Sequence, residues 1–471
     1  METTTTSEAR GYRYRWYVLA VVLIADVMDL LDATVANLAG PSIRAELGGS
    51  ESTLQWILAS YTLTFAIGLI ISARLGDLIG RKQMFVVGMA GFTLASLLCG
   101  LAPTPGLLIA ARVLQGLLGA VMIPQGFAMV KQAFHPDDLQ KAFIPFGPIM
   151  ALSAVAGPIL AGVLIDGDLF GTGWRMIFLI NVPIGLVGAY LSWRYLPDIE
   201  RDSSARLDVS GSLILALASG LLVYPLVQGR ELDWPLWTFG MIAAALVLFV
   251  VFARHERRSA HPVIEPSLFG HRGYVAGLFF LGVFFVAMTG FSLVSNLFIQ
   301  IGLGYSPFDT GLAQTPLALG MALGAVVSGA VLGPRLGRHV LHLGLAVAAL
   351  GLAWLALVVG RGTGIDGWDL APALFLSGFG VGLIFAPLFD IILADLGDRE
   401  VGSGSGLLNA VQQFAGAFGV AVLGTLLFGW VPDAGWFVAT QHLIWVCVGC
   451  YAAAFVAVFA LPMRARGDAV V

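Results

Sequence analysis

Ala73-Arg-Leu-Gly-Asp-Leu-Ile-Gly-Arg-Lys82 is the stretch that decides the fold of this chain, because it returns later as Ala330-Val-Leu-Gly-Pro-Arg-Leu-Gly-Arg-His339. Five of the ten positions are identical, and each stretch follows an apolar segment long enough to cross a bilayer. A loop repeated at the same place in the order of helices indicates two related halves. The simpler alternative is that any Gly-rich turn with arginines looks like this.

The composition predicts an integral membrane protein of the all-α class. Hydrophobic residues make up 58% of the chain, charged residues 11%, and the mean hydropathy is +0.88. Soluble domains carry about 25% charged residues, and a helix needs about 20 mostly apolar residues to cross a bilayer. The net charge of −4, without a basic patch, argues against a nucleic-acid partner.

Fourteen apolar segments are predicted to form transmembrane helices. Short polar stretches rich in Gly, Pro, Asp and Arg separate them, and none is long enough for a soluble domain. The predicted spans are residues 16–38, 53–73, 83–102, 105–130, 141–164, 176–196, 209–227, 236–254, 274–299, 309–332, 339–359, 370–393, 403–430 and 438–463.

The distribution of basic residues predicts the orientation. With the N-terminus in the cytoplasm, 20 of the 25 Lys and Arg residues lie in cytoplasmic segments, four lie outside, and Arg112 lies within a span. Cytoplasmic loops of membrane proteins carry such an excess. Both termini, residues 1–15 and 464–471, are therefore expected in the cytoplasm, which requires an even number of spans.

The repeat also predicts the domains. Residues 16–196 and 274–463 are expected to form two six-helix bundles, and residues 197–273 hold an inserted pair of helices with its flanking loops. Duplicated bundles are typical of secondary transporters, whose sites lie near the middle of the membrane.

Three carboxyl groups in the first span are the most informative polar residues. Asp26, Asp29 and Asp32 lie on one helical stripe that rises about 9 Å. A charge inside the bilayer costs at least about 2.5–3.5 kcal/mol, so these groups need water, partners or protons. Burial and mutual repulsion favour the protonated forms, and the set is expected to titrate as a coupled group. Such a site binds a proton or a cation, as a proton-coupled carrier requires.

Arg112 in the fourth span is the expected partner of these acids, because it is the only basic residue placed within a span. Asp26 has an alternative role as a packing carboxyl satisfied by neighbouring hydroxyl or amide groups. Amide side chains in other spans are candidates for a substrate path, although joining helices is their commoner role. These amides are Asn37, Gln115, Gln125, Asn296, Gln300, Asn409 and Gln413.

Several motifs resemble those of the major facilitator superfamily. Gly76-Asp77-Leu-Ile-Gly80-Arg81-Lys82 is similar to its signature loop, with Ala73 where the family usually has its first Gly. The run that begins at Arg112 resembles the fourth-helix motif. Gly157-Pro158-Ile-Leu-Ala161-Gly162 resembles the fifth-helix antiporter motif, with Ala161 in place of a Gly.

Further motifs resemble the fourteen-helix drug:proton antiporters of that superfamily. They are Leu31-Asp-Ala-Thr-Val-Ala-Asn-Leu-Ala-Gly-Pro41, Trp174-Arg-Met-Ile-Phe-Leu-Ile-Asn-Val-Pro183 and Gly404-Ser-Gly-Leu-Leu-Asn-Ala-Val-Gln-Gln413. The resemblance covers roughly residues 10–465, and six motifs occur in the family's order.

The resemblance implies roles for particular residues. It places the coupling acid at Asp32 and an arginine at Arg112, and it makes the signature loop a gate in which Asp77 caps the next helix and pairs with arginines. It also implies that the fifth-helix motif favours exchange over leak. The implied function is export of a lipophilic or cationic small molecule, of the drug or antibiotic type, in exchange for protons by alternating access.

Other functions stay open at this point. An importer, or an exporter of a siderophore or lipid, would share the fold, whereas a membrane enzyme on lipid substrates would need a carboxylate cluster or nucleophile that the sequence lacks. No GxxxxGK[ST] loop for ATP is present, and no cofactor or metal is expected. The expected state is a monomer in the cytoplasmic membrane of a bacterium, whose partners are protons, the lipid bilayer and the small-molecule substrate.

Overall fold

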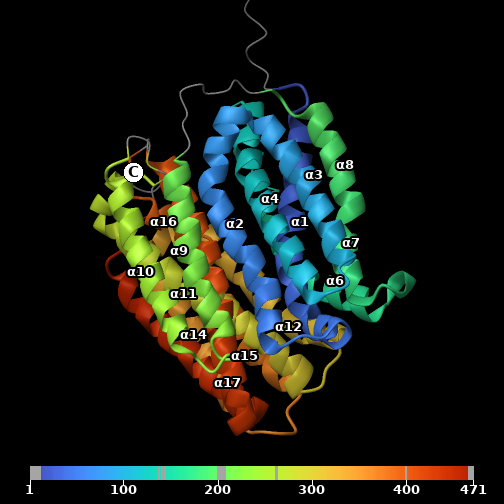
Figure 1. Cartoon of the computed structure of the whole chain (residues 1–471). Coiled ribbons are helices and arrows are strands. Elements are labelled where there is room, and N and C mark those ends of the chain that lie inside the picture. The colour runs from blue at the N-terminus through green and yellow to red at the C-terminus, as the bar shows by residue number, and fades with distance from the viewer. Residues whose placement is uncertain are drawn as a thin grey trace, which may run out of the picture.

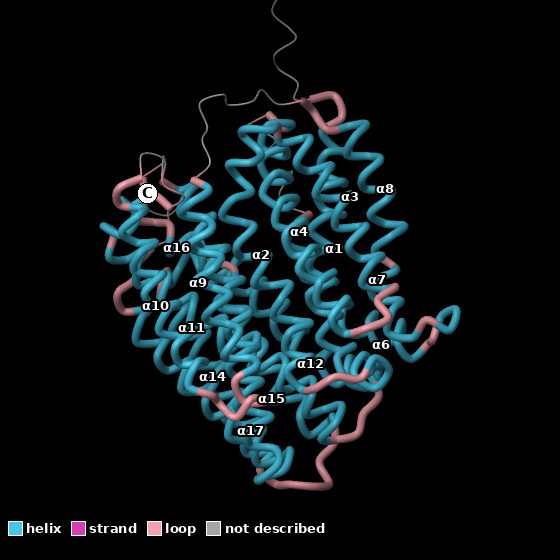
Figure 2. Tube along the Cα trace, viewed as in Figure 1, coloured by secondary structure: helices cyan, strands magenta, loops and turns pink. Residues whose placement is uncertain are grey.

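The chain folds entirely into helices over the residues that the computed structural model describes. These residues are 12–135, 138, 142, 145–198, 208–259, 262, 264–397 and 400–464. Long helices run side by side, and the regular structure drawn is helical throughout (Figures 1 and 2). Ten of the described helices are long and apolar enough to cross a membrane. The prediction of an all-α membrane protein is confirmed.

The helices are grouped by the predicted division into a first bundle, an inserted pair and a second bundle, and this division stays a prediction. The first bundle contains α1 (Arg15–Leu47), α2 (Glu51–Ile79), α3 (Arg81–Gly100), α4 (Pro105–Ala133), α6 (Phe146–Asp166), α7 (Met176–Leu179) and α8 (Asn181–Tyr195). The inserted pair is α9 (Val209–Gln228) and α10 (Leu236–Glu256). The second bundle contains α11 (Arg272–Leu297), α12 (Pro307–Val327), α13 (Gly333–Leu336), α14 (His339–Val359), α15 (Gly367–Phe385), α16 (Leu388–Ile392) and α17 (Val401–Val458). Short turns η1 (Leu169–Gly171), η2 (Gly173–Arg175), η3 (Pro266–Gly270), η4 (Phe298–Gly302) and η5 (Ser328–Leu332) join some of them.

α17 is a helical hairpin rather than one straight helix. Gly435 interrupts it with φ 75° and ψ 169°, a left-handed backbone that suits glycine. A Cβ on Gly419 would lie 2.4 Å from the carbonyl oxygen of Val286, and the Cys447 thiol lies 3.8 Å from that of Ala287. A straight helix would separate positions 419 and 447 by about 42 Å. The two halves of α17 therefore run antiparallel to each other, and both pack against α11. They correspond to the two predicted spans 403–430 and 438–463.

The first helix is longer than predicted. The predicted span ended at residue 38, before Gly40-Pro41, but α1 continues through Pro41 to Leu47. A proline within a helix removes one backbone hydrogen bond and bends the helix without ending it when the freed groups find other partners. The three aspartates consequently lie near the middle of α1.

The two bundles join at one end of the molecule. The Gln300 side chain donates to the Leu38 carbonyl at 2.9 Å, and the Phe308 amide donates to Asp166 at 2.8 Å. Gln55 in α2 donates to the Val420 carbonyl in α17 at 3.4 Å. These contacts involve the last part of α1, the first part of α2, the end of α6, the start of α12 and the first half of α17.

The inserted pair contacts both bundles at the joined end. Its connecting loop places Glu231 against Ser52, whose backbone amide and hydroxyl both donate to the carboxylate at 2.8 Å. Burial raises the pKa of Glu231, but these hydrogen bonds outweigh it, so the pKa lies below its usual value. Arg230 pairs with Glu51 of the first bundle and donates to the Phe428 carbonyl of the second at 3.2 Å. This loop therefore links the two bundles at the joined end.

Candidate functional site

A buried ion pair lies at the centre of the first bundle. Asp32 of α1 pairs with Arg112 of α4, and their side chains are 0% and 1% exposed. Asp32 also accepts hydrogen bonds from Gln115 of α4 at 2.8 Å and from Asn181 of α8 at 3.3 Å. Of the three predicted acids, Asp32 is the one that contacts Arg112 among the described residues, and its role in proton coupling stays a prediction. Three side chains thus donate to this carboxylate, which is shut off from solvent.

Contacts from α2 and α7 hold the Arg112 side chain in one orientation. Its Nε donates to the Ile57 carbonyl at 3.2 Å. The guanidinium lies over the ring of Tyr61, 4.2 Å from the ring centre, and 5.6 Å from that of Phe178. Such cation–π contacts stabilise a desolvated charge by roughly 2 kcal/mol or more. Arg112 is therefore a fixed cation between four helices.

Asp29 lies one turn from Asp32 and has a different partner. The Tyr61 hydroxyl donates a hydrogen bond to one of its oxygens. Unlike Asp32, which is fully buried, Asp29 is partly exposed. Tyr61 thus contacts the acid through its hydroxyl and the arginine through its ring, so one side chain joins both parts of the site.

Asp26 completes the stripe but lies apart from this network. Its side chain is 5% exposed, and its Oδ2 has no hydrogen-bond partner among the described residues. The alternative role, a packing carboxyl satisfied by nearby hydroxyl or amide groups, therefore lacks support at this oxygen. A buried polar oxygen without a partner is costly, so a role of Asp26 in binding a proton or a cation stays a prediction.

The candidate amides divide into those that join helices and those that do not. Gln125 of α4 donates to the Ser72 carbonyl of α2 at 2.8 Å, Gln300 bridges the two bundles, and Gln115 belongs to the ion-pair network. Asn296 and Asn409 bond to carbonyls of their own helices, Ser292 and Ser405. Asn37 and Gln413 are partly exposed on α1 and α17. A substrate path along these amides stays a prediction.

Three site residues were missed by sequence reasoning. Tyr61 and Ser96 gave no signal, because a hydroxyl in an apolar span is common; Ser96 accepts a hydrogen bond from Gln115 at 2.9 Å. Asn181 stood in a quoted motif but was given no role. An amide in the otherwise apolar run Met176–Pro183 was the available signal.

The signature loop forms a tight turn between α2 and α3. Gly80 has φ 115°, a value that favours glycine, and Asp77 pairs with Arg81 at 2.9 Å. The expected capping of α3 by Asp77 is wrong, because Asp77 lies inside the last turn of α2 and Gly80 occupies the N-cap. A Cβ on Gly76 would lie 2.1 Å from the Gln125 amide oxygen, so a larger residue there would displace the Gln125 side chain of α4.

The fifth-helix motif packs against the opposite bundle. A Cβ on Gly162 would lie 2.3 Å from the Cα of Phe308, and a Cβ on Gly311 would lie 2.4 Å from the Pro158 carbonyl oxygen. On its other side, Gly157 approaches Thr34 of α1, with 2.7 Å to the hydroxyl. Small residues allow helices in a membrane to approach closely. α6 and α12 therefore touch backbone to backbone at the joined end.

Replacing Gly162 with alanine is expected to separate the bundles at this end and to slow export. The added methyl group would overlap the Phe308 backbone, which cannot move as a side chain can. With the native cysteines replaced by serine, labelling of Asn37→Cys by an impermeant maleimide should rise several-fold. Gly220→Ala, whose Cβ meets nothing within 4 Å, is the control. Unchanged labelling of the Gly162 variant would contradict this role.

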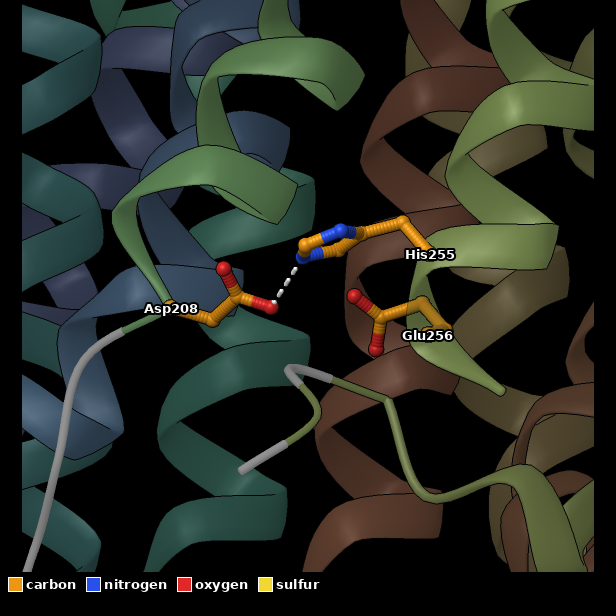
Figure 3. Close-up of side chains that lie close together, drawn as sticks. All are labelled: Asp208, His255 and Glu256. Carbon is orange, nitrogen blue, oxygen red and sulfur yellow. Dashed lines mark hydrogen bonds and ion pairs between the residues drawn. The ribbon is translucent and has the colours of Figure 1, made fainter. Parts of the chain in front are cut away.

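A second cluster of ionisable groups lies where α9 begins and α10 ends. Asp208, His255 and Glu256 have ligand atoms within 4.8 Å of one another, and His255 pairs with Asp208 at 2.7 Å (Figure 3). Asp208 also caps α9 by accepting from the Gly211 amide at 2.9 Å. Burial raises its pKa, but the hydrogen bonds from Gly211, Ser210 and His255 lower it to about 2. An N-cap and an ion pair account for this arrangement.

Asp208→Ala is expected to destabilise the inserted pair by about 0.5–2 kcal/mol, the usual loss for an N-cap. Asp208→Asn keeps the cap and should lose less. Because the folded pKa of Asp208 is depressed, its contribution is complete above the ordinary pKa of 3.8 and disappears as the pH falls toward about 2. Thermal unfolding in detergent at pH 7 and at pH 3 measures both effects. Equal melting of all three proteins would contradict the assignment.

Comparison with known proteins agrees with this architecture. The sequence matches the Major Facilitator Superfamily profile over residues 22–420. It is 49% identical over 426 residues to the probable actinorhodin transporter of Streptomyces coelicolor, covering 89% of this chain and 73% of that protein. It is 36% identical over 420 residues to a puromycin resistance protein of Streptomyces alboniger, covering 88% and 82%. It is 32% identical over 430 residues to the tetracenomycin C resistance and export protein of Streptomyces glaucescens, covering 90% and 78%.

Solved structures share the fold at low sequence identity. A POT family transporter in complex with a thioalcohol conjugated peptide superimposes with a TM-score of 0.67 at 18% identity, over 93% of this chain and 95% of that one. The POT family transporter PepTSo gives a TM-score of 0.67 at 12% identity, over 94% and 97%. At these identities the likeness concerns the arrangement of helices.

Proposed function

Because this chain belongs to the Major Facilitator Superfamily, we propose that it exports an antibiotic-type small molecule across the membrane in exchange for protons. The chain is a multi-pass membrane transporter and not an enzyme, and its matched relatives include antibiotic transporters and resistance proteins. The proton-coupling part of the proposal rests on one observation: of two neighbouring aspartates, Asp32 pairs with Arg112 and Asp29 is bonded instead to Tyr61, whose ring lies under Arg112.

Charge balance assigns the proton to Asp29. Asp32 and Arg112 neutralise each other, and Gln115 and Asn181 also donate to Asp32. An ionised Asp29 would leave the cluster with one negative charge inside the bilayer, at a cost of at least about 2.5 kcal/mol. A protonated Asp29 leaves it neutral. Asp29 is therefore the acid that gains and loses the proton, although the resemblance placed coupling at Asp32.

The partial exposure of Asp29 supports this assignment. A coupling acid must exchange its proton with water, and Asp29 is more exposed than the sealed Asp32. Tyr61 links Asp29 to the face of Arg112. Loss of the proton from Asp29 would attract Arg112 toward it and loosen the Asp32 pair. Protonation in this way changes the contacts among α1, α2 and α4.

The joined end supports alternating access. Gln55 and Asp166 of the first bundle bond to the second bundle at this end, and Gln300 of the second bundle bonds to the Leu38 carbonyl of the first. We assign this end to the extracellular side, because the count of basic residues places the opposite end in the cytoplasm. The structure then corresponds to a carrier closed to the outside. Export requires these contacts to break while the opposite ends approach.

The proposal also covers the membrane in which the chain lies, the side on which its termini lie, and its oligomeric state. Relatives in Streptomyces and Klebsiella support the cytoplasmic membrane of a bacterium. Both termini are assigned to the cytoplasm. The working unit is assigned to the monomer, because the buried network of Asp32, Arg112, Gln115 and Asn181 is formed within one chain.

Expression in a bacterial host that lacks its own pumps tests the function. Resistance should rise toward at least one compound in a panel that includes puromycin, tetracenomycin C, actinorhodin and ethidium. Purified protein in liposomes should then take up protons as that compound moves the other way. A compound that is exported without any proton movement would contradict the exchange.

The substrate class follows from the same acids. Three carboxyl groups on one stripe favour a cationic substrate, and Asp26 has a buried oxygen without a hydrogen-bond donor. In counterflow, which needs no net proton movement, an Asp26→Asn, Asp29→Asn double variant is expected to lose transport of an ethidium-like cation more than that of a neutral antibiotic. Equal transport of both compounds by this variant would exclude a cation site.

A further inference from the structure

A groove runs along the outer surface of the second bundle, between α11 and the second half of α17. Its volume is about 460 Å³. On α11, Arg272, Val275, Ala276 and Phe279 follow the i, i+3, i+4, i+7 pattern of one helical face. On α17, Ala453, Val456 and Ala457 form the facing stripe. Alanines on both stripes leave the space that larger side chains would fill.

The groove opens away from the protein. Phe279 is 58% exposed, Val456 is 69% exposed and Phe269 is 51% exposed. In a membrane-spanning chain, large apolar side chains that face outward contact lipid tails. The stripe from Arg272 to Phe279 rises about 10 Å, within the roughly 15 Å of hydrocarbon in one leaflet. The groove therefore has the depth and lining of an acyl-chain site.

One end of the groove is cationic. Arg272 begins α11, is exposed, and has no ion pair within the described part of the chain. A Cβ on Gly273 would lie 2.9 Å from Pro462, so the chain end that carries Arg464 reaches the same corner. Asp395 also lies against Gly273, but neither arginine forms an ion pair with it. Arg272 thus lies where the groove meets the headgroup layer, and Arg464 follows Pro462 by two residues in the chain.

We propose that this groove binds an anionic phospholipid of the leaflet on the basic side. Its phosphate would lie on Arg272, with Arg464 beside it, and an acyl chain would lie between the two stripes. Guanidinium groups suit phosphate because they donate parallel hydrogen bonds. Basic pockets between membrane helices are a general means of recognising anionic headgroups. The proposal rests on the membrane position of the chain and not on what it exports.

Native mass spectrometry of the full chain tests the proposal. Protein is exchanged into micelles with equal amounts of phosphatidylglycerol and phosphatidylcholine that carry the same acyl chains. The native chain should retain phosphatidylglycerol preferentially. Arg272→Gln with Arg464→Gln should reduce its retention by about fivefold for each guanidinium removed. Arg272→Lys with Arg464→Lys keeps both charges and should retain much of the preference.

A second pair of arginines provides the matched control. Arg257 and Arg258 are exposed at the end of α10, on the same side by the charge count. Arg257→Gln with Arg258→Gln should leave retention unchanged. If both glutamine double variants lost phosphatidylglycerol equally, retention would depend on the overall surface charge and not on this groove, and the proposed site would be overturned. Equal retention of the two lipids by the native chain would overturn it as well. Ala276→Phe, which fills the groove without changing charge, should release the lipid.

Discussion

Asp29→Asn is expected to abolish export driven by a pH gradient while sparing exchange of the same compound between the two sides. Asparagine fits the space and still accepts the Tyr61 hydrogen bond, but it cannot take up or release a proton. Liposomes with a substrate from the resistance panel provide the measurement. Uphill movement should fall at least tenfold, the equivalent of about 1.4 kcal/mol, and counterflow of labelled substrate should persist.

Two neighbouring variants decide whether the effect belongs to Asp29. Asp26→Asn removes a carboxyl group one turn away and should keep pH-driven export of a neutral substrate. Asp32→Asn removes the partner of Arg112 and should impair both pH-driven export and counterflow. If Asp29→Asn exported normally and only Asp32→Asn lost coupling, the proton would belong to Asp32, as the family resemblance implies.

Arg112→Leu is expected to be the most damaging single change to stability. It leaves the Asp32 carboxylate, 0% exposed, without its counter-ion. Breaking a buried ion pair from one side usually costs about 3–5 kcal/mol. The variant also loses the bond to the Ile57 carbonyl and the contact with the Tyr61 ring. Thermal unfolding in detergent, with bound substrate absent, measures the loss.

The double variant Arg112→Leu, Asp32→Leu separates stability from transport. Replacing both charges removes the uncompensated carboxylate, so most of the lost stability should return. Transport should not return, because the charge that responds to Asp29 is gone. A single Arg112→Leu variant that melts like the native chain would show that the buried pair contributes little and would weaken the proposed coupling.

The motif resemblance and the comparisons lead to the same family, but they leave the proton unassigned. A motif marks Asp32 and Arg112 because both stand in recognisable runs, and the structure does join them. Asp29 and Tyr61 stand outside those positions. Their contact exists because α1 and α2 are rotated so that residue 29 faces residue 61. The sequence around either residue does not specify how α1 and α2 are rotated relative to each other.

By itself, the sequence determined the membrane class, the order of the spans, the division into bundles and inserted pair as a prediction, and the partner of Asp32. These features depend on local hydropathy and on there being one basic residue within a span. Tertiary structure alone decided that Tyr61, Ser96 and Asn181 join the site, that Gln125 and Gln300 bridge helices, and that Gly162 meets the Phe308 backbone. The reason is physical: the rotation and depth of each helix are set by packing against its neighbours, which no single span specifies.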